Sequence, residues 1–214
     1  MMVNNFENYG QKDLQNQFGL SLFVMEKLCL YEAMLKKWQR KINLVGPKTL
    51  DDIWRRHILD SLQILNHIPE TAKILVDLGS GAGLPGLILA IVADQNNDLD
   101  VHLVESDQRK AVFLREVNRE TNAGVTVHSQ RIENIENLKA DVITARALAP
   151  LENLLKLSQY HQHEATTLLL LKGENVQQEL TQADKSWKMK VSEIPSLSGG
   201  AGCLLQIKEC VHRG

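Results

Sequence analysis

Several features of an anchored, secreted or disulfide-stabilised protein are missing from this sequence. It has only three cysteines and no Cys-x-x-Cys pair, which suits a reducing compartment and argues against a disulfide scaffold or a zinc ribbon. Its longest apolar run, Leu84–Ala93, spans about ten residues and is broken by a proline and a glycine, whereas a bilayer span needs roughly 20. The first ten residues have neither a basic start nor an apolar core, so no signal peptide is visible. We therefore expect a cytoplasmic protein with no membrane partner.

A strong charge of either sign is absent as well. The chain has 24 basic and 26 acidic residues, a net charge of −2, which excludes a histone-like or polybasic protein. With 43% apolar and 23% charged residues in 214, the composition is that of an ordinary globular domain rather than a disordered chain. A chain of this length can bury a core without disulfides or a structural metal.

The first 70 residues show helical spacing. One helix face is formed by residues that recur at steps of three and four, namely Leu28, Tyr31, Leu35, Trp38 and Ile42. A second helix is predicted over about residues 50–65, because Asp51 and Asp52 stand near its start, where the helix dipole favours anions. We interpret residues 1–70 as an N-terminal helical cap and residues 71–214 as the main domain.

From about residue 73 the pattern alternates between strand and helix, which predicts right-handed crossovers and a mostly parallel sheet. The last two strands are joined by a glycine-rich loop that cannot hold a helix, so one of them is expected to be antiparallel. The fold class is therefore α/β, a Rossmann-like, doubly wound sheet of seven strands with the N-terminal helical cap. The predicted strands cover residues 74–78, 101–105, 125–128, 141–144, 167–172, 189–194 and 203–208.

The strongest motif is the loop Val76–Gly86, which follows the first strand and precedes an apolar helix. Glycines allow positive φ and close approach of a ligand to the backbone, and the helix start offers free N–H groups to an anion. Gly81 to Gly86 fits the G-x-G-x-x-G pattern of dinucleotide sites. Asp77 to Gly83 fits instead an acidic-x-G-x-G-x-G pattern, which resembles the first motif of S-adenosyl-L-methionine (AdoMet) methyltransferases.

Asp77 favours the second interpretation. A carboxylate at the strand end suits a ligand with an ammonium and a sulfonium group, whereas it would repel a pyrophosphate. Gly79 also begins directly after the strand. Glu105 ends the second strand, where an acidic residue can accept hydrogen bonds from ribose hydroxyls of either cofactor. A ligand-free glycine turn and a solvated strand-end acid are the alternatives for these two features.

Missing motifs narrow the target atom. No Asn/Asp-Pro-Pro-aromatic segment, which amino-group methyltransferases carry, is present, and no Pro-Cys pair supplies a thiolate for attack on a pyrimidine. A ring nitrogen such as guanine N7 needs neither, because its lone pair is already a nucleophile and has no proton to lose. Catalysis is then mostly positioning of that nitrogen in line with the methyl group.

Three segments together resemble one family. Arg56-His57-Ile58-Leu59-Asp60-Ser61, the loop Gly79–Gly86 with its Gly-Leu-Pro-Gly end, and Ala145-Arg146-Ala147 look like RsmG, also called GidB. The similarity runs over about residues 38–173, well over half the chain. It implies methylation of a guanine N7 in bacterial small-subunit (16S) ribosomal RNA, free or within the small ribosomal subunit or an assembly precursor, with AdoMet as cofactor and no metal.

The resemblance also implies site residues. Arg146 matches the family arginine near the methyl-transfer centre, and we expect it to orient cofactor and substrate, although a surface salt bridge is the alternative. Ile132 and Glu133 match the pair along the adenine, with a simple strand-end turn as alternative. The expected cofactor-binding residues are Asp77, Gly79, Ser80, Gly81, Gly83, Leu84, Glu105, Ile132, Glu133 and Arg146.

RNA contacts are expected on the helical cap. Residues 36–57 hold seven basic and two acidic side chains, a net charge of +5, so the rest of the chain carries −7 and the overall balance conceals a local basic patch. His57 and Asp60 could instead hydrogen-bond to each other as a structural lock, and Lys172 could simply flank a strand end. The predicted RNA-binding residues are Lys36, Lys37, Arg40, Lys41, Arg55, Arg56, His57 and Lys172.

The sequence differs from the family pattern at one place, and two alternative functions remain open. The loop Ser198–Cys203 lacks the basic residue expected there, which puts C-terminal RNA contacts in doubt. The rivals are an NAD-dependent oxidoreductase on the same glycine loop and a ribosome-assembly factor without activity. AdoMet binding without NAD binding argues against the first, and methyl transfer to whole subunits against the second.

Overall fold

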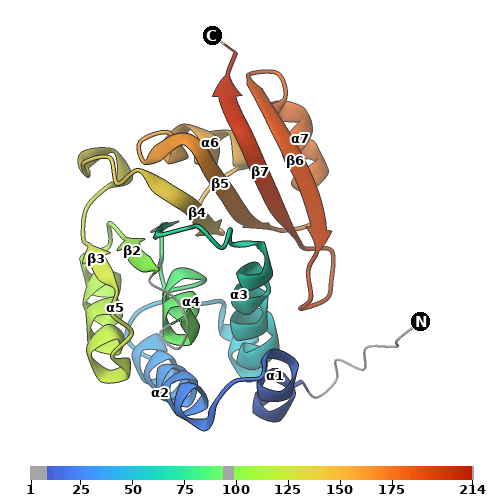
Figure 1. Ribbon diagram of the computed structural model, residues 1–214. Coiled ribbons are helices and arrows are strands. Elements are labelled where there is room, and N and C mark those ends of the chain that lie inside the picture. Colours follow the sequence, from blue (N-terminus) through green and yellow to red (C-terminus); the bar gives the residue numbers. More distant parts are fainter. Residues whose placement is uncertain (1–8, 94–98, 214) are drawn as a thin grey trace.

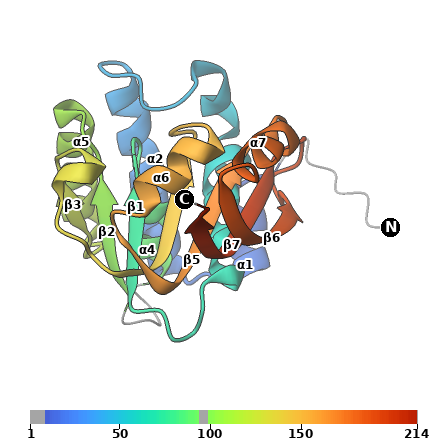
Figure 2. The same cartoon turned by 90° about the horizontal axis from the view of Figure 1, so that it is seen from above.

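A computed structural model describes residues 9–93 and 99–213 of the chain and contains one seven-stranded sheet (Figure 1). The absence of a signal peptide was inferred from residues 1–10, of which 1–8 lie outside the described residues. The strand order is β3-β2-β1-β4-β5-β7-β6, and Figure 2 shows the labelled strands running from β3 at one edge to β6 at the other. The strands are β1 (Ile74–Leu78), β2 (Asp100–Val104), β3 (Thr126–His128), β4 (Ala140–Arg146), β5 (Gln162–Lys172), β6 (Trp187–Pro195) and β7 (Cys203–His212).

The direction of the strands confirms the predicted fold class. Strands β1 to β5 are parallel, and β7 is antiparallel to both β5 and β6. The pairing of Lys172 with Cys203 puts the end of β5 beside the start of β7. The carboxyl ends of the parallel strands therefore meet the β6–β7 loop at one edge of the sheet, which is where α/β proteins build their sites.

Helices cover both faces of the sheet. On one face lie α1 (Gln11–Phe18), α2 (Leu22–Gln39), α4 (Gly86–Ala93) and α5 (Gln108–Thr121), and on the other α6 (Leu151–Ser158) and α7 (Val176–Ala183). Alternate strand residues point to opposite faces, so Leu75 belongs to the first core and Val76 to the second. The first core includes residues on both sides of position 70, and the division of the chain there stays a prediction.

The long helix of the cap agrees with the sequence in its interior and differs at its end. Leu28, Tyr31 and Leu35 are fully buried on one face of α2, as their spacing predicts. The helix begins after Ser21, whose hydroxyl accepts from the Val24 amide, and ends at Gln39, so Ile42 lies beyond it.

The prediction of one helix over about residues 50–65 is wrong in its detail. The segment is a series of short helices: a 3₁₀ helix (Pro47–Asp52), a π-helix (Trp54–Leu59), the single turn α3 (Asp60–Leu62) and a second 3₁₀ helix (Gln63–His67). The π turn buries Trp54, His57, Ile58 and Leu59 while Arg56 stays exposed. π-Helical turns are rare and frequently occur at functional sites.

No helix within the described residues is long and apolar enough to cross a membrane.

Candidate functional site

The glycine loop forms a tight turn after β1. Gly79, Gly81 and Gly83 have φ values of +66°, +54° and +83°, which L side chains rarely adopt. A Cβ added at Gly79 would come within 2.5 Å of Leu148 Cδ1, whereas one at Gly81 would meet nothing closer than Gly79 O at 3.7 Å. The backbone is therefore packed against Leu148 at Gly79 and open at Gly81.

The open side of this loop borders a cavity of about 400 Å³, which we call the glycine-loop pocket. Its walls come from the ends of β1, β2, β3 and β4, so it lies at the expected edge of the sheet. The walls include Gly79, Gly81, Glu105, Ile132, Glu133, Ala147 and Leu148.

Glu105 lies in this wall and is bonded to the backbone of two loops. Its Oε2 accepts from the Gly81 amide at 2.8 Å, and its Oε1 accepts from the Asp107 amide at 2.7 Å. The carboxylate thus ties the end of β2 to the glycine loop. Whether it also binds a ribose stays a prediction.

Four predicted contacts lie behind the loop rather than in the wall. Asp77 is fully buried, and the hydroxyl of Thr144 donates to its Oδ1 at 2.7 Å. Burial raises the pKa of Asp77 to about 6, and the Thr144 hydrogen bond opposes part of that rise. Ser80, Gly83 and Leu84 are also packed inside and do not line the pocket. The turn folds these residues inward, where they support the loop, and their direct contact with a ligand stays a prediction.

Ile132 and Glu133 line the pocket from the short helix Ile132–Asn134. The carbonyl oxygen of Ile132 lies 3.2 Å from Nε2 of His161, a fully buried histidine just before β5. Burial lowers the pKa of His161, so the neutral ring is favoured there. Sequence reasoning missed this support, because no local pattern connects residues 29 positions apart.

A second cavity of about 560 Å³ lies next to the first, and we call it the arginine pocket. Ala147 and Leu148 line both cavities, so the two meet at the end of β4. The other walls of the arginine pocket come from the π-helix, the end of β5, α7 and the β6–β7 loop. They include Arg55, Arg56, Asp60, Arg146, Lys172, Glu179, Ser196 and Ser198.

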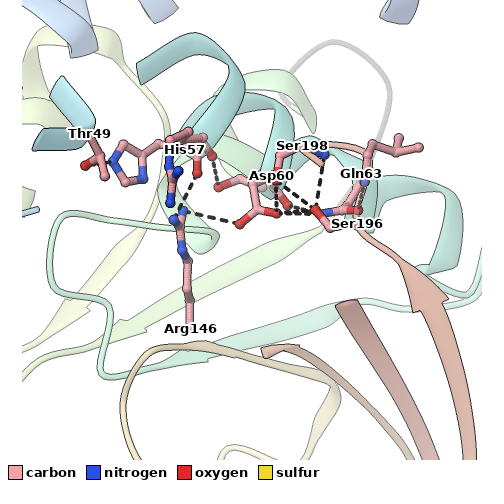
Figure 3. Close-up of polar contacts among 10 residues, drawn as sticks. Thr49, His57, Asp60, Gln63, Arg146, Ser196 and Ser198 are labelled. Atoms are coloured by element: carbon pink, nitrogen blue, oxygen red, sulfur yellow. Dashed lines mark hydrogen bonds and ion pairs between the residues drawn. The ribbon is translucent and has the colours of Figure 1, made fainter. Parts of the chain in front are cut away.

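Asp60 is the centre of a hydrogen-bond network in this pocket (Figure 3). Its Oδ1 accepts from Gln63 Nε2 at 2.8 Å, Ser196 Oγ at 2.9 Å and Ser198 Oγ at 3.1 Å. Its Oδ2 lies 3.6 Å from Arg146 Nη1. This network joins the cap to the β6–β7 loop, which is more than 130 residues away in the sequence.

Arg146 therefore faces the arginine pocket and is absent from the wall of the glycine-loop pocket. Besides its ion pair with Asp60, its Nη2 donates to the carbonyl oxygen of Arg56 at 2.9 Å. Its guanidinium is directed toward the π-helix, and the expected cofactor contact of Arg146 stays a prediction. Arg146 positions Arg56 and Asp60.

His57 has a different partner from the one the sequence suggested. Its Nε2 lies 2.7 Å from the hydroxyl of Thr49, and no described residue hydrogen-bonds to its Nδ1. Burial, then Arg146 and Arg56, lower the pKa of His57 to about 3. A buried, neutral histidine of this kind packs the cap and does not present a charge to RNA.

Two predicted RNA-binding cations are engaged inside the protein. Lys172 forms an ion pair with Glu179 and donates to the Ala149 carbonyl oxygen at 3.1 Å. Arg55 pairs with Asp52 and donates to the Ser198 carbonyl oxygen at 2.8 Å. Both side chains therefore have partners within the protein, and their contact with RNA stays a prediction.

The other predicted basic residues are exposed. Lys36, Lys37, Arg40 and Lys41 lie at and just beyond the end of α2, and Lys36 pairs with Glu32. Trp38, between them, packs edge-on against Phe113 near the start of α5 at a centroid distance of 5.8 Å. Because Lys110 near the start of α5 lines the glycine-loop pocket, this contact brings the end of α2 to the side of the sheet where that pocket lies.

Within the described residues, no group of three or more histidine, cysteine, aspartate or glutamate side chains is placed to hold a metal ion.

The chain matches a family of known proteins. Residues 24–203 match the family model GidB, described as rRNA small subunit methyltransferase G. A relative from Paramagnetospirillum magneticum is 49% identical over 96% of this chain and 98% of its own, and one from Rhodospirillum centenum is 48% identical over 94% and 92%. Both are named ribosomal RNA small subunit methyltransferase G.

Solved structures support the fold. A SAM-dependent methyltransferase from Aquifex aeolicus superimposes with a TM-score of 0.57 at 13% identity, covering 82% of this chain and 96% of its own. A methyltransferase from Geobacter sulfurreducens gives a TM-score of 0.56 at 13% identity, covering 94% and 96%. Likeness at this identity concerns the fold alone.

Proposed function

The chain belongs to the rRNA small subunit methyltransferase G (GidB) family, and on that premise we propose that it transfers a methyl group from AdoMet to N7 of a guanine in 16S ribosomal RNA. The observation that carries this proposal is the pair of cavities that meet at Ala147 and Leu148. A methyl donor in one and a nucleotide in the other would face each other across the end of β4.

The glycine-loop pocket fits the proposed cofactor. Gly81 leaves its backbone open to the cavity, and a side chain there would fill the space that a ligand must approach. Glu105 and Ile132 both line this pocket, which supports the proposal that Glu105 accepts from the ribose hydroxyls and that the adenine ring lies against Ile132. When bound, AdoMet supplies a methyl group on a sulfonium, a leaving group that needs no protonation.

The arginine pocket fits a nucleotide taken out of its stack, since its volume exceeds that of one base. Guanine N7 attacks through its own lone pair, so the protein residues need to bind, orient and exclude water rather than remove a proton. Arg146 serves this purpose by holding the Arg56 carbonyl group and Asp60 in place.

RNA binding is proposed for the exposed cations around these pockets, namely Arg56 and the α2 group Lys36, Lys37, Arg40 and Lys41. Phosphate contacts of this kind give salt-dependent affinity and set the register of the RNA. The substrate proposed is 16S rRNA within the small subunit or an assembly precursor, which places the enzyme in the cytoplasm.

The test has two parts. Mass spectrometry of 16S rRNA should reveal one N7-methylated guanine that is missing from cells lacking the gene and restored by incubation of their subunits with enzyme and AdoMet. Calorimetry should detect binding of AdoMet or its demethylated product and none of NAD. Unchanged guanine methylation in the deletion strain would contradict the proposal, and binding without transfer would favour an assembly factor.

A further inference from the structure

Glu179 on α7 lines the arginine pocket, as Ala147 and Leu148 do. One oxygen, Oε2, accepts from the Leu151 amide at 2.6 Å and pairs with the ammonium group of Lys172. No described residue donates a hydrogen bond to the other oxygen, Oε1. The side chain retains 24% of its accessible surface. The carboxylate is thus fixed at one oxygen and available at the other.

The other charged groups of the pocket are engaged, apart from the exposed side chain of Arg56. Asp60 accepts three hydrogen bonds at Oδ1 and has Arg146 beside Oδ2. Arg55 and Lys172 are paired with Asp52 and Glu179. Oδ2 of Asp60 and Oε1 of Glu179 both lack a described hydrogen bond, but Asp60 faces Arg146 and keeps 13% of its side-chain surface against 24% for Glu179, so Glu179 is the more accessible carboxylate of this pocket.

The position of Glu179 suits one edge of a purine. The two pockets meet at Ala147 and Leu148, so a reacting N7 must lie at that shared wall. N7 belongs to the five-membered ring, and the Watson–Crick edge of the six-membered ring lies on the opposite side. A purine in this orientation extends that edge into the arginine pocket, whose lining includes Lys172 and Glu179.

We propose that Glu179 accepts hydrogen bonds from N1–H and the 2-amino group of the target guanine and so selects guanine over adenine. This inference rests on the proposed function. Adenine has an acceptor at N1 and no 2-amino group, so it would face the carboxylate with a lone pair. With adenine bound, the carboxylate oxygen would be removed from water without a hydrogen-bond donor, and this cost makes such a site reject the wrong base.

The same contact suits the reaction. The N7 lone pair forms the bond to the methyl carbon, the sulfur–methyl bond breaks with its electrons left on sulfur, and no proton is transferred. The positive charge moves from the sulfonium to the purine. A carboxylate on N1–H then stabilises the cationic ring more than the neutral one, which lowers the barrier.

A cycle of protein and base changes tests the proposal. Small subunits are reconstituted with guanine or inosine at the methylated position, because inosine keeps N1–H, O6 and N7 and lacks only the 2-amino group. Single-turnover methyl transfer is measured at saturating AdoMet for wild type, Glu179→Gln and the matched control Glu174→Gln. Glu174 is exposed and does not line either pocket.

Wild type and Glu174→Gln should both be slower on inosine by about tenfold. Glu179→Gln should be slower on guanine by about tenfold, because its single amide oxygen is needed by the Leu151 amide and its NH₂ then opposes N1–H. Replacing guanine by inosine should slow methyl transfer by this variant by less than about twofold, since the contact with the 2-amino group is already gone. AdoMet affinity should be equal in all three proteins.

If the change from guanine to inosine slows wild type and Glu179→Gln by the same factor, the proposal is overturned. Wild type alone also tests it, whatever the stability of the variant: an enzyme that methylates guanine and inosine at the same rate does not read the 2-amino group. Absence of any guanine methylation by wild type would instead contradict the proposed function.

Discussion

Arg146 at the end of β4 and Asp60 on α3 lie 3.6 Å apart, from Nη1 to Oδ2, in the wall of the arginine pocket. Asp60 binds the hydroxyls of Ser196 and Ser198 through its other oxygen. A single carboxylate therefore holds together the cap, a central strand and the β6–β7 loop. An ion pair of this length with three further hydrogen bonds acts mainly by fixing positions.

Asp60→Asn should loosen the β6–β7 loop. The amide keeps one acceptor but cannot serve two hydroxyls and Arg146 together, so the free energy of unfolding should fall by about 1–3 kcal/mol. Hydrogen exchange at the amides of Leu197 and Ser198 should become faster, and methyl transfer slower, with AdoMet affinity unchanged. Unaltered exchange at these amides would show that the network does not hold the loop.

Gly79→Ala should lose the cofactor site through a steric clash. The added Cβ would lie 2.5 Å from Leu148 Cδ1 in a backbone with φ of +66°. Gly124→Ala is the matched control, because its φ is +73° and nothing lies within 4 Å of the new Cβ. Both variants should be destabilised by about 1–2 kcal/mol from the positive φ.

Only Gly79→Ala should also weaken AdoMet binding measured by calorimetry. Its Kd should rise by about tenfold or more, a loss of about 1.4 kcal/mol or more in binding free energy. If both variants bind AdoMet equally well, Leu148 moves without cost and does not shape the pocket.

Neutralising Lys36, Lys37, Arg40 and Lys41 together to Gln should weaken binding to small subunits and leave AdoMet affinity intact. Removal of four phosphate contacts should lower the slope of log K against log salt by about 3. The control replaces four exposed lysines near β6 and β7, namely Lys185, Lys188, Lys190 and Lys208. Equal effects from both quadruple variants would mean that net charge, and not this surface, binds the RNA.

His57 should make the protein sensitive to acid. Its pKa falls from 6.5 to about 3 on folding, so between these values the unfolded chain binds more protons than the folded one. The stability that it contributes is complete above about pH 6.5 and is lost as the pH falls toward 3. His57→Gln, which can still reach Thr49, should flatten this part of a urea-unfolding profile measured from pH 7 to pH 4.

A difference between wild type and His57→Gln that stays constant over that range would show that His57 titrates alike in both states.

Much of the fold could be predicted because local patterns specify it. Short apolar runs separated by helical stretches located all seven strands, and the glycine-rich link between residues 195 and 203 implied the antiparallel end. The segment Pro47–His67 could not be predicted in detail. Its π turn depends on burial of Trp54 and His57 against distant elements, and a helical pattern alone does not choose between α, 3₁₀ and π hydrogen bonding.

The residues of the candidate site were also predictable only in part. Gly79, Gly81, Glu105 and Ile132 were found because their motif lies in one stretch or at strand ends, and all line a pocket. The partners of charged residues were not found. His57 binds Thr49 instead of Asp60, and Lys172 binds Glu179, because such pairs depend on how helices and loops pack in three dimensions.

The residues of the two pockets are synthesised in a fixed order, and those of the β6–β7 loop come last. Every residue that lines the glycine-loop pocket lies before Gln159, whereas the arginine pocket needs residues up to Cys203. Synthesis proceeds from the N-terminus, so a nascent chain holds all parts of the first pocket before it holds those of the second. A chain that loses the final hairpin keeps every residue that lines the glycine-loop pocket and loses Cys203 from the lining of the arginine pocket.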